Sequence, residues 1–253
     1  MTQSDRTILS VSGPDATDFL QGLVTNDVTR LRSGLVYTAL LTPQGKYRAD
    51  FFLVPDQQAD SAEGETILID VAPDLASDLM RALTMYKLRS KVAVTQIDRQ
   101  VTRGLGTPPD GTFSDPRDPA MGWRGYHGQP GDDDIDWDAR RVTACVPASG
   151  IELTADTFIL EAGFERLNGV DFRKGCYVGQ EVTARMKHKT ELRKGLAPVT
   201  VTGSAPVGTA IDADGKAAGV LYTQSGGAGI AYLRFDRANG PMTAGTARVT
   251  RQS

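Results

Sequence analysis

Hydrophobic residues along this chain follow a period of two in some segments and a helical period in others, which indicates a fold of mixed strands and helices. Short runs rich in β-branched and aromatic residues predict strands over residues 7–11, 35–41, 47–54, 66–71, 91–97 and 141–147. Helical spacing predicts helices between Ser12, the expected cap, and Thr25, from Pro73 to Tyr86, and over 154–163. Met80 and Met85 of the second helix are interpreted as core residues rather than metal ligands.

Two later segments differ from the first part in composition. From 107 to 138, prolines, glycines and the aspartate-rich run 132–136 predict an extended acidic connection. Trp123, Tyr126 and Trp137 are expected to tuck it against the body. Residues 195–253 hold short β-rich runs separated by glycines, which predict a small antiparallel barrel or sandwich. The expected division is a first region over 1–191 and a β-rich C-terminal domain over 195–253.

Composition limits the class of protein. The chain has 253 residues, an ordinary apolar content and a formal net charge of −3, which argues against a disordered chain, a nucleic-acid-coating surface or a membrane-binding protein. No apolar run reaches the roughly 18 residues that a spanning helix needs, and the first six residues lack a signal-peptide pattern. Two cysteines argue against a disulfide scaffold and for a reducing compartment. A cytoplasmic location is expected, with an organelle matrix, after transit-peptide removal, as the alternative.

The segment 173–181, with the sequence Arg-Lys-Gly-Cys-Tyr-Val-Gly-Gln-Glu, carries the most chemistry. Cys176 lies close to Lys174, and a nearby cation favours thiolate over thiol. Gly175 and Gly179 allow a positive φ or a close approach of the backbone. Cys145 lies among apolar residues and is expected to be a buried, inert thiol. These residues predict a reactive thiol on a shaped loop, and composition alone leaves a structural cysteine as the alternative at 176.

Four ordered segments resemble one family. They are KGCYVGQE at 174–181, FLQGLVTNDV at 19–28, TPQGK followed by ADF within 42–51, and YKLRSKV at 86–92. Together they resemble the YgfZ family of folate-binding proteins that assist iron–sulfur cluster assembly and repair. That family is related in fold to the glycine cleavage T-protein, an aminomethyltransferase. The resemblance implies a GcvT-like α+β fold, with two interwoven lobes around a central cavity and a C-terminal antiparallel β-barrel.

The resemblance also implies a site. Cys176 would be the functional thiol, with Lys174 favouring its thiolate form, and tetrahydrofolate or a one-carbon derivative would bind centrally. The residues expected at the folate are Asn26, Asp27, Asp50, Tyr177, Gln180, Glu181 and Arg185. A purely structural turn is the alternative for 25–27, because such residues hydrogen-bond their own backbone.

Few ligands are available for an iron–sulfur cluster. A cluster held by one chain needs about four thiolates, or thiolates with histidines, and this chain offers Cys145, Cys176, His127 and His188. No metal site on the chain alone is therefore expected, although Cys176 could supply one ligand to a cluster shared transiently with a partner. The resemblance implies iron–sulfur carrier or scaffold proteins and cluster-containing client enzymes as partners.

Two alternative functions remain on the same fold. A folate-dependent aminomethyl transferase carries two aspartates after the glycine-rich turn, and an ungapped alignment places Ala49 at the first, catalytic position and Asp50 at the second. Alanine cannot accept or orient a proton, so a classical enzyme is not expected. A shift of one residue would restore an aspartate. The other alternative is a non-catalytic adaptor.

Basic residues concentrate between 173 and 194, where the sequence has seven Lys and Arg residues and only two Glu residues. Such a run is either a solvated helix face or an anion site that steers a folate's glutamyl tail or an acidic carrier protein. Binding to RNA is not expected, because the segment has no nucleic-acid module and no interleaved aromatic residues.

Overall fold

The computed structural model describes residues 6–56, 65–132, 134–189 and 192–252. The chain divides into two compact units, Met1–Ile135 with Glu165–Val182, and Asp136–Phe164 with Thr183–Ser253. The second unit therefore holds more than the β-rich domain expected over 195–253. In the described part of the chain, no helix is both long and apolar enough to cross a membrane.

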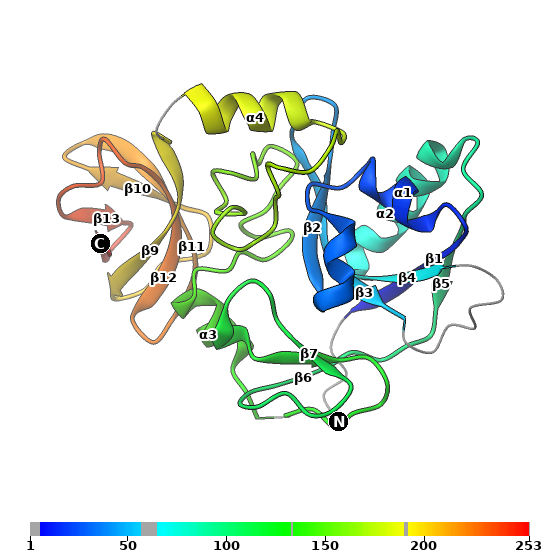
Figure 1. Cartoon of the computed structure of the whole chain (residues 1–253). Coiled ribbons are helices and arrows are strands. Elements are labelled where there is room, and N and C mark those ends of the chain that lie inside the picture. The colour runs from blue at the N-terminus through cyan, green and yellow to red at the C-terminus, as the bar shows by residue number, and fades with distance from the viewer. Residues whose placement is uncertain (1–5, 57–64, 133, 190–191, 253) are drawn as a thin grey trace. The chain divides into compact units, whose positions relative to one another are not determined.

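The first unit is built on a five-stranded antiparallel sheet with the order β2-β3-β4-β1-β5 (Figure 1). Its strands are β1 (Thr7–Gly13), β2 (Val36–Leu41), β3 (Tyr47–Pro55), β4 (Glu65–Val71) and β5 (Ala93–Ile97). The register places Leu9 opposite Ile69 and Ala39 opposite Asp50. All five predicted strands of this region are confirmed.

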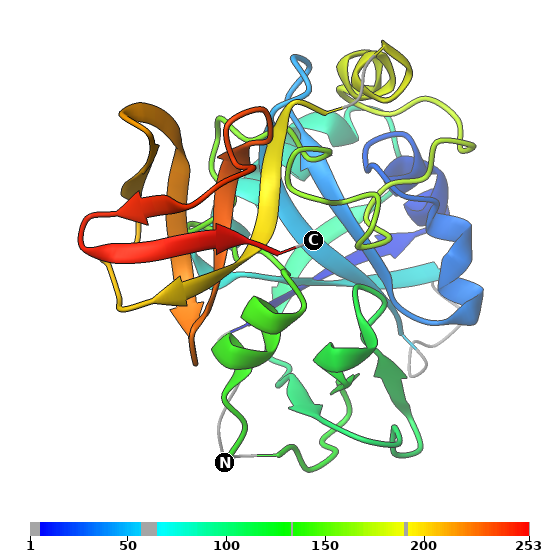
Figure 2. The ribbon, with the colours of Figure 1, turned by 90° about the vertical axis from the view of Figure 1, so that its left-hand side faces the viewer.

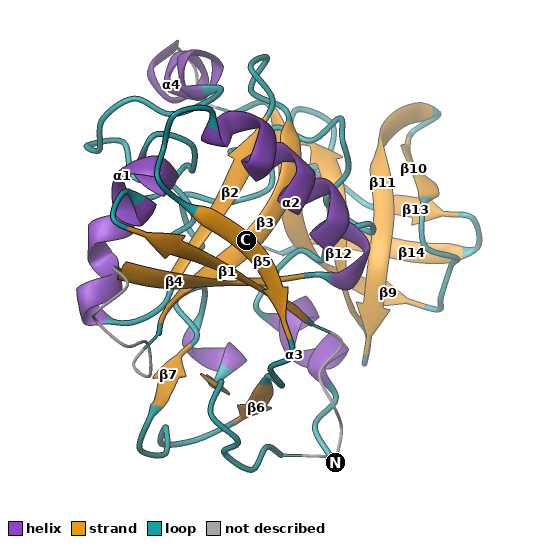
Figure 3. Ribbon diagram, turned by 90° about the vertical axis from the view of Figure 1, so that its right-hand side faces the viewer, coloured by secondary structure: helices purple, strands orange, loops and turns teal. Residues whose placement is uncertain are grey.

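Helices α1 (Ala16–Gln21) and α2 (Pro73–Lys87) pack on one face of this sheet (Figure 3). Alternate strand residues such as Leu9 and Phe51 meet Leu20 of α1 and Leu79 of α2 there, as the period of two requires. A short 3-10 helix, η1 (Val28–Ser33), follows α1.

Two local predictions in these helices are wrong. Ser12 does not cap α1, because β1 continues to Gly13, which pairs with Glu65 of β4. Met85 is 68% exposed and is not a core residue. It lies two positions beyond Leu83, and two helical positions place a side chain on the opposite side of the helix.

The segment expected to be an extended acidic connection forms a second, three-stranded sheet. Its strands, in the order β6-β8-β7, are β6 (Thr102–Gly104), β7 (Thr112–Ser114) and β8 (Trp123–Gly125), with the 3-10 helix η3 (Pro119–Met121) between β7 and β8. Trp123 and Tyr126 are buried, as predicted.

A buried ion network holds this small sheet to the large one. The Asp70 carboxylate on β4 accepts hydrogen bonds from Arg6, from Arg124 of β8 at 2.8 Å and from the Tyr126 hydroxyl at 2.8 Å. Burial alone would raise the pKa of Asp70, but the Arg6 and Arg124 guanidiniums outweigh it and hold the pKa below its usual range. Arg124 also pairs with Asp115, which Arg117 holds at 2.7 Å.

The second unit begins with a helix, α3 (Trp137–Thr143), so the strand predicted over 141–147 is wrong. Asp136 caps α3 by accepting a hydrogen bond from the Ala139 N–H at 2.9 Å, and Arg141 pairs with buried Glu152 at 3.0 Å. These polar contacts favour the helix over the β-branched pattern of 142–146. Cys145 is buried, as predicted.

The helix predicted over 154–163 is also wrong, because that segment is a series of turns. The Thr157 hydroxyl accepts a hydrogen bond from the Thr154 N–H at 3.0 Å, and the Thr154 hydroxyl accepts one from the Asp156 N–H. Such side-chain bonds compete with helix formation.

The barrel or sandwich predicted for the C-terminal residues is a closed six-stranded barrel with the order β10-β11-β12-β9-β14-β13 (Figure 2). Its strands are β9 (Lys194–Thr202), β10 (Thr209–Ala213), β11 (Lys216–Ser225), β12 (Ala228–Arg234), β13 (Met242–Ala244) and β14 (Ala247–Arg251). The alternate residues Ala197, Val199 and Val201 of β9 fill its interior.

Candidate functional site

The turn Thr25–Asn26–Asp27 joins the large sheet to the segment that leads to Cys176. The Thr25 hydroxyl donates to the Gly169 carbonyl at 2.7 Å and accepts from the Ala39 N–H of β2 at 2.9 Å. The Thr25 carbonyl accepts from the Asp171 N–H at 3.1 Å. One buried threonine therefore holds residues 169–171 against β2.

Asn26 lies at the same junction, and its side-chain polar groups form hydrogen bonds within the protein rather than with a ligand. Its side-chain amide donates to the Tyr37 carbonyl at 2.8 Å and to the Asn168 carbonyl at 2.6 Å, and its oxygen accepts from the Asp27 N–H. The residue is 2% exposed. The structural interpretation of this turn therefore describes Asn26 better than a folate-binding one.

Asp27 caps η1. Its carboxylate accepts hydrogen bonds from the Thr29 N–H, the Thr29 hydroxyl and the Gln21 amide. Burial alone would raise the pKa of Asp27, but these hydrogen bonds, with the charge of Arg30, hold it below its usual range.

Lys174 reaches into this junction, and its ammonium contacts backbone rather than solvent. It donates to the carbonyls of Gln21 at 2.8 Å, Val24 at 2.5 Å and Asn26 at 3.0 Å. An ammonium has three N–H donors, so these three acceptors use all of them. The Tyr177 ring covers it, with the nitrogen 5.2 Å from the ring centroid. The sequence predicts that Lys174 favours the thiolate form of Cys176. In the structure, its ammonium instead binds three backbone carbonyls and so fixes the loop; we call this contact the Lys174 clamp.

Two glycines bring this loop against the turn between β2 and β3. Gly179 has φ +81°, and a Cβ there would lie 2.6 Å from the Thr42 carbonyl oxygen. Gly45 has φ +74°, and its Cβ would lie 2.7 Å from Cβ of Val182. The close backbone approach predicted for Gly179 is therefore present. Gly175 has neither a positive φ nor an atom within 4 Å of the Cβ position.

Cys176 is exposed, on a loop fixed by Lys174 before it and by Gly179 after it. Tyr177 is buried under the Lys174 ammonium. Gln180 and Glu181 open α4 (Gln180–Lys189), and Glu181 is exposed. Arg185, the remaining residue predicted to bind folate, belongs to the second unit.

Asp50 and Ala49 lie on opposite faces of β3. Ala49 is buried in the apolar core that α1 and α2 share with the sheet, a place where a catalytic carboxylate would be unpaired. Asp50 points to the other face, where its two oxygens accept hydrogen bonds from the Tyr47 hydroxyl at 2.7 Å and the Tyr37 hydroxyl at 2.9 Å. Asp50 is 5% exposed, so these hydrogen bonds lie in the interior of the fold.

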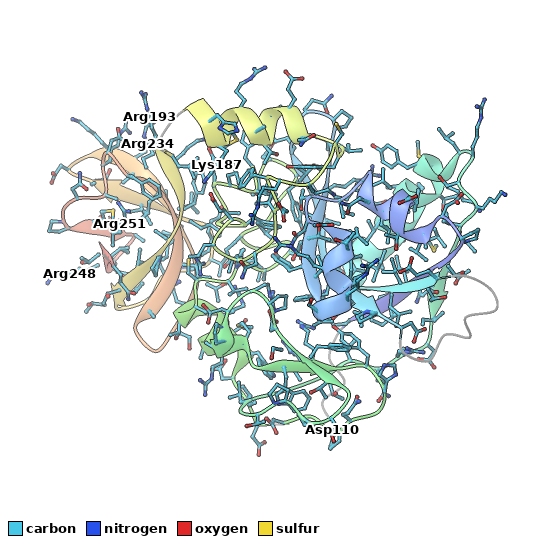
Figure 4. The ribbon with its side chains drawn as sticks, in the orientation of Figure 1. Asp110, Lys187, Arg193, Arg234, Arg248 and Arg251 are labelled. Atoms are coloured by element: carbon cyan, nitrogen blue, oxygen red, sulfur yellow. The ribbon has the colours of Figure 1, made fainter. Side chains whose placement is uncertain are left out.

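The basic run 173–194 is divided between the two units. Lys174 is buried in the first unit, whereas the exposed Lys187 and Arg193, labelled in Figure 4, belong to the second. A cavity of about 400 Å³ lies elsewhere in the first unit, between the start of β1 and residues 96–100, and none of the predicted site residues lines it.

Sequence reasoning missed the residues that make the junction rigid. Gln21, Val24 and Thr25 lie in the motif segment 19–28, but nothing in their residue types indicates contacts with residues about 150 positions away along the chain, and Asn168 lies in none of the four segments. The buried ion network of Asp70, Asp115, Arg117 and Arg124 was missed as well, because its members are spread over 55 residues. A signal for the network was present in the arginines placed among the buried aromatic residues of 113–126.

Replacing Gly179 by alanine should destabilise the protein by about 2 kcal/mol or more, because a side chain at positive φ is strained and its Cβ would overlap the Thr42 carbonyl. Gly175→Ala is the matched control on the same loop and should change the free energy of unfolding by less than about 0.5 kcal/mol. Urea unfolding of the two variants measures both effects. Equal stability of the variants would show that the loop does not pack on the β2–β3 turn.

Lys174→Met should lower the free energy of unfolding by about 3 kcal/mol, because it leaves three backbone carbonyls without their donor. The effect depends on pH. Burial lowers the pKa of Lys174 from 10.5 to about 8, so between pH 8 and 10.5 the unfolded chain binds more protons at this residue than the folded chain.

The stability of the native protein relative to Lys174→Met should therefore rise as the pH rises from 8 to 10.5. Urea unfolding of both proteins at several pH values measures this difference. A difference that stays constant over that range would contradict the buried ammonium.

Comparison with known proteins supports the fold and identifies relatives. The family model described as the C-terminal beta-barrel domain of CAF17 matches residues 193–252. The solved glycine cleavage system aminomethyltransferase T from Bartonella henselae aligns over 99% of this chain and 83% of its own, with a TM-score of 0.73 at 13% identity. That identity supports a shared fold and nothing further. The predicted GcvT-like α+β fold with a C-terminal antiparallel barrel is thus confirmed.

The relatives found include proteins named iron–sulfur cluster assembly factor IBA57. The homologue from Neurospora crassa is 32% identical over 84% of this chain and 55% of its own length. The human protein is 30% identical over 94% of this chain and 78% of its own length. The chain thus spans little more than half of the fungal relative and most of the human one.

These relatives are named mitochondrial, so the cytoplasmic location expected from the sequence is wrong on this comparison. Two free cysteines indicate a reducing compartment but do not distinguish the cytoplasm from an organelle matrix. The extent and identity of the match to the human protein are sufficient to place the sequence: this chain belongs to the IBA57 family of iron–sulfur cluster assembly factors.

Proposed function

We propose that this chain acts in iron–sulfur cluster assembly or repair, as an accessory protein whose Cys176 thiolate supplies one ligand to a cluster that other proteins carry. Family membership supports the process, because the relatives are named assembly factors. The single observation that supports the residue is exposure: Cys176 is exposed, whereas Cys145 is buried. Only an accessible thiol can reach a cluster on another protein.

The cluster is a substrate in this proposal, and it is shared between proteins. Among the described residues, no group of three or more His, Cys, Asp and Glu is arranged to hold a metal ion. One cysteine satisfies about a quarter of the thiolate ligands that a cluster requires, so a carrier or scaffold protein, or a client enzyme, must supply the others. Binding of iron by Cys176 releases the thiol proton, because the ligand is the thiolate.

The contacts around the loop give Cys176 a fixed position for such a transfer. The Lys174 clamp holds the loop two residues before the thiol, and the close contact of Gly179 with Thr42 holds it three residues after. A ligand held in place loses little conformational freedom when it meets a partner's cluster, which favours binding.

Tetrahydrofolate binding, which the resemblance to the YgfZ family implies, is a separate part of the proposal. Asn26 and Asp50 do not fit it, because their polar groups already serve hydrogen bonds inside the fold. Tyr177 is covered by Lys174. Of the other residues that the resemblance implies, Asp27, Gln180 and Glu181 belong to the first unit, where Glu181 is exposed, and Arg185 is an exposed residue of the second unit.

Cys176→Ser should abolish the support of cluster-dependent enzymes, because a serine hydroxyl does not replace a thiolate ligand. The measurement is the activity of an iron–sulfur cluster enzyme in cells whose own copy of the gene is deleted and which express the variant. Cys145→Ala, the change at the buried cysteine, is the matched control and should retain activity. Full activity with Cys176→Ser would remove the thiol from the mechanism and leave an adaptor role.

Tetrahydrofolate should bind the purified chain saturably, and Glu181→Gln should weaken it about tenfold or more, because a hydrogen bond to a charged group is lost. Glu165→Gln, at another exposed glutamate of the first unit, is the control and should bind as the native chain does. Isothermal titration calorimetry measures all three affinities. Absence of saturable binding would remove folate from the proposal and leave the role of Cys176 standing.

A further inference from the structure

The end of α2 and the residue that follows it expose apolar side chains that the proposed function does not use. Leu88 is 89% exposed and Met85 is 68% exposed. Among the described residues, four large apolar side chains are exposed, and these two lie within one turn of each other. Scattered exposed apolar residues are ordinary, so this pair bears on binding only together with the charge and the strand edge beside it.

Leu88 also has an unfavourable backbone. It follows the last residue of α2 with φ 36° and ψ −94°, a conformation that glycine adopts and that a leucine side chain disfavours. The Lys91 N–H, which donates to the Asp15 carboxylate at 2.7 Å, fixes the other end of this connection. The strain is thus held by the surrounding structure while the side chain it presents stays in water.

The same segment is basic. Residues 79–97 contain Arg81, Lys87, Arg89 and Lys91 and neither aspartate nor glutamate, in a chain whose net charge is −3. Arg81 pairs with Asp78 at 3.3 Å. In the part of the chain that the structure describes, the other three form no ion pair; Asp15 accepts a hydrogen bond from the Lys91 N–H, and Asp78 and Asp98 flank the segment in sequence. This surface therefore suits a negatively charged partner.

Strand β5, which follows directly, forms the edge of the large sheet. It pairs with β1 on one side, and no strand of the described residues pairs with it on the other. Its residues are exposed or half-buried throughout. Figure 3 shows β5 in the foreground, with α2 beside it. Edge strands present unpaired N–H and C=O groups, which can bind an added strand.

We propose that an extended acidic segment of a partner protein adds to β5 as a sixth strand of the sheet and places an apolar side chain against Met85 and Leu88. The edge supplies backbone hydrogen bonds, the cations at 87, 89 and 91 supply charge complementarity, and the apolar pair supplies the anchor.

Other occupants fit these observations less well. A bilayer would accept the apolar pair and the cations but would leave the β5 backbone groups unpaired, which hydrocarbon does not tolerate. A second copy of this chain, paired edge to edge, would bring like charges together, a device that proteins use to prevent such pairing. A nucleic acid would lack a ring to stack on, because no aromatic residue among those described is exposed and Tyr86 is half-buried against the core.

The first experiment identifies the partner in cells. The full chain carries the photoreactive residue benzoylphenylalanine at Leu88, and a second version carries it at Val207, an exposed apolar residue of the second unit that serves as the control. The proposal expects protein cross-links from position 88 that position 207 does not give, joined to an acidic, extended segment of the partner. Cross-links to lipid alone, or the same proteins from both positions, would overturn it.

The second experiment measures binding of the identified partner, purified, by titration calorimetry and hydrogen exchange. Amide hydrogens of 93–97 should become protected when the partner binds, and Met85→Asp with Leu88→Asp should weaken binding at least tenfold. Val207→Asp is the matched control and should bind as the native chain does. Protection confined to segments other than β5, or an unchanged affinity of the double variant, would overturn the proposal.

Leu88→Gly separates binding from folding. Glycine relieves the backbone strain, so the melting temperature should not fall, while the loss of the apolar side chain should weaken partner binding. Retained affinity with an intact fold would contradict the anchoring role of Leu88.

Discussion

The ammonium of Lys174, bound to three backbone carbonyls, is the interaction on which the rest of the candidate site depends. It lies where the turn after α1 meets the segment that carries Cys176, and it satisfies acceptors that would otherwise be left without a donor. Thr25 and Asn26 hold the same segment from the other side. The exposed thiol thus projects from a rigid base, and its reach is set by contacts made two residues earlier.

Three of the sequence segments that resemble one family meet at this base. Residues 19–28 supply the carbonyls, 174–181 supplies the ammonium and the thiol, and the turn within 42–46 packs on Gly179. Many of the residues that make these motifs specific therefore have structural roles. The glycines allow close backbone contact, the asparagine forms internal hydrogen bonds, and the lysine binds backbone carbonyls. The thiol of Cys176, in contrast, is exposed.

The sequence predicted all five strands of the large sheet and the β-rich character of the barrel, because period-two patterns and glycine-rich turns are local signals. It failed where a polar contact decided the structure. Asp136 and Arg141 make a helix of a segment whose β-branched residues suggested a strand, and the threonines at 154 and 157 break an apparent helix. The site was predicted in part. The exposed Cys176 and the close packing of Gly179 agree with the motif. The partners of Lys174 could not be predicted, because every residue has a backbone carbonyl and the sequence does not show which of them accept a hydrogen bond.

The junction at Lys174 also bears on the order in which the chain can fold. All five strands of the large sheet have been synthesised once Ile97 is added, yet the carbonyls of Gln21, Val24 and Asn26 gain their donor only 148 to 153 residues after they are made. Contacts of such long sequence separation form late and slow the folding of a domain. While residues 98–173 are being added, the nascent chain therefore holds all five strands of the sheet without the donor that closes the junction, and the loop of Cys176 gains its anchor only when Lys174 is added.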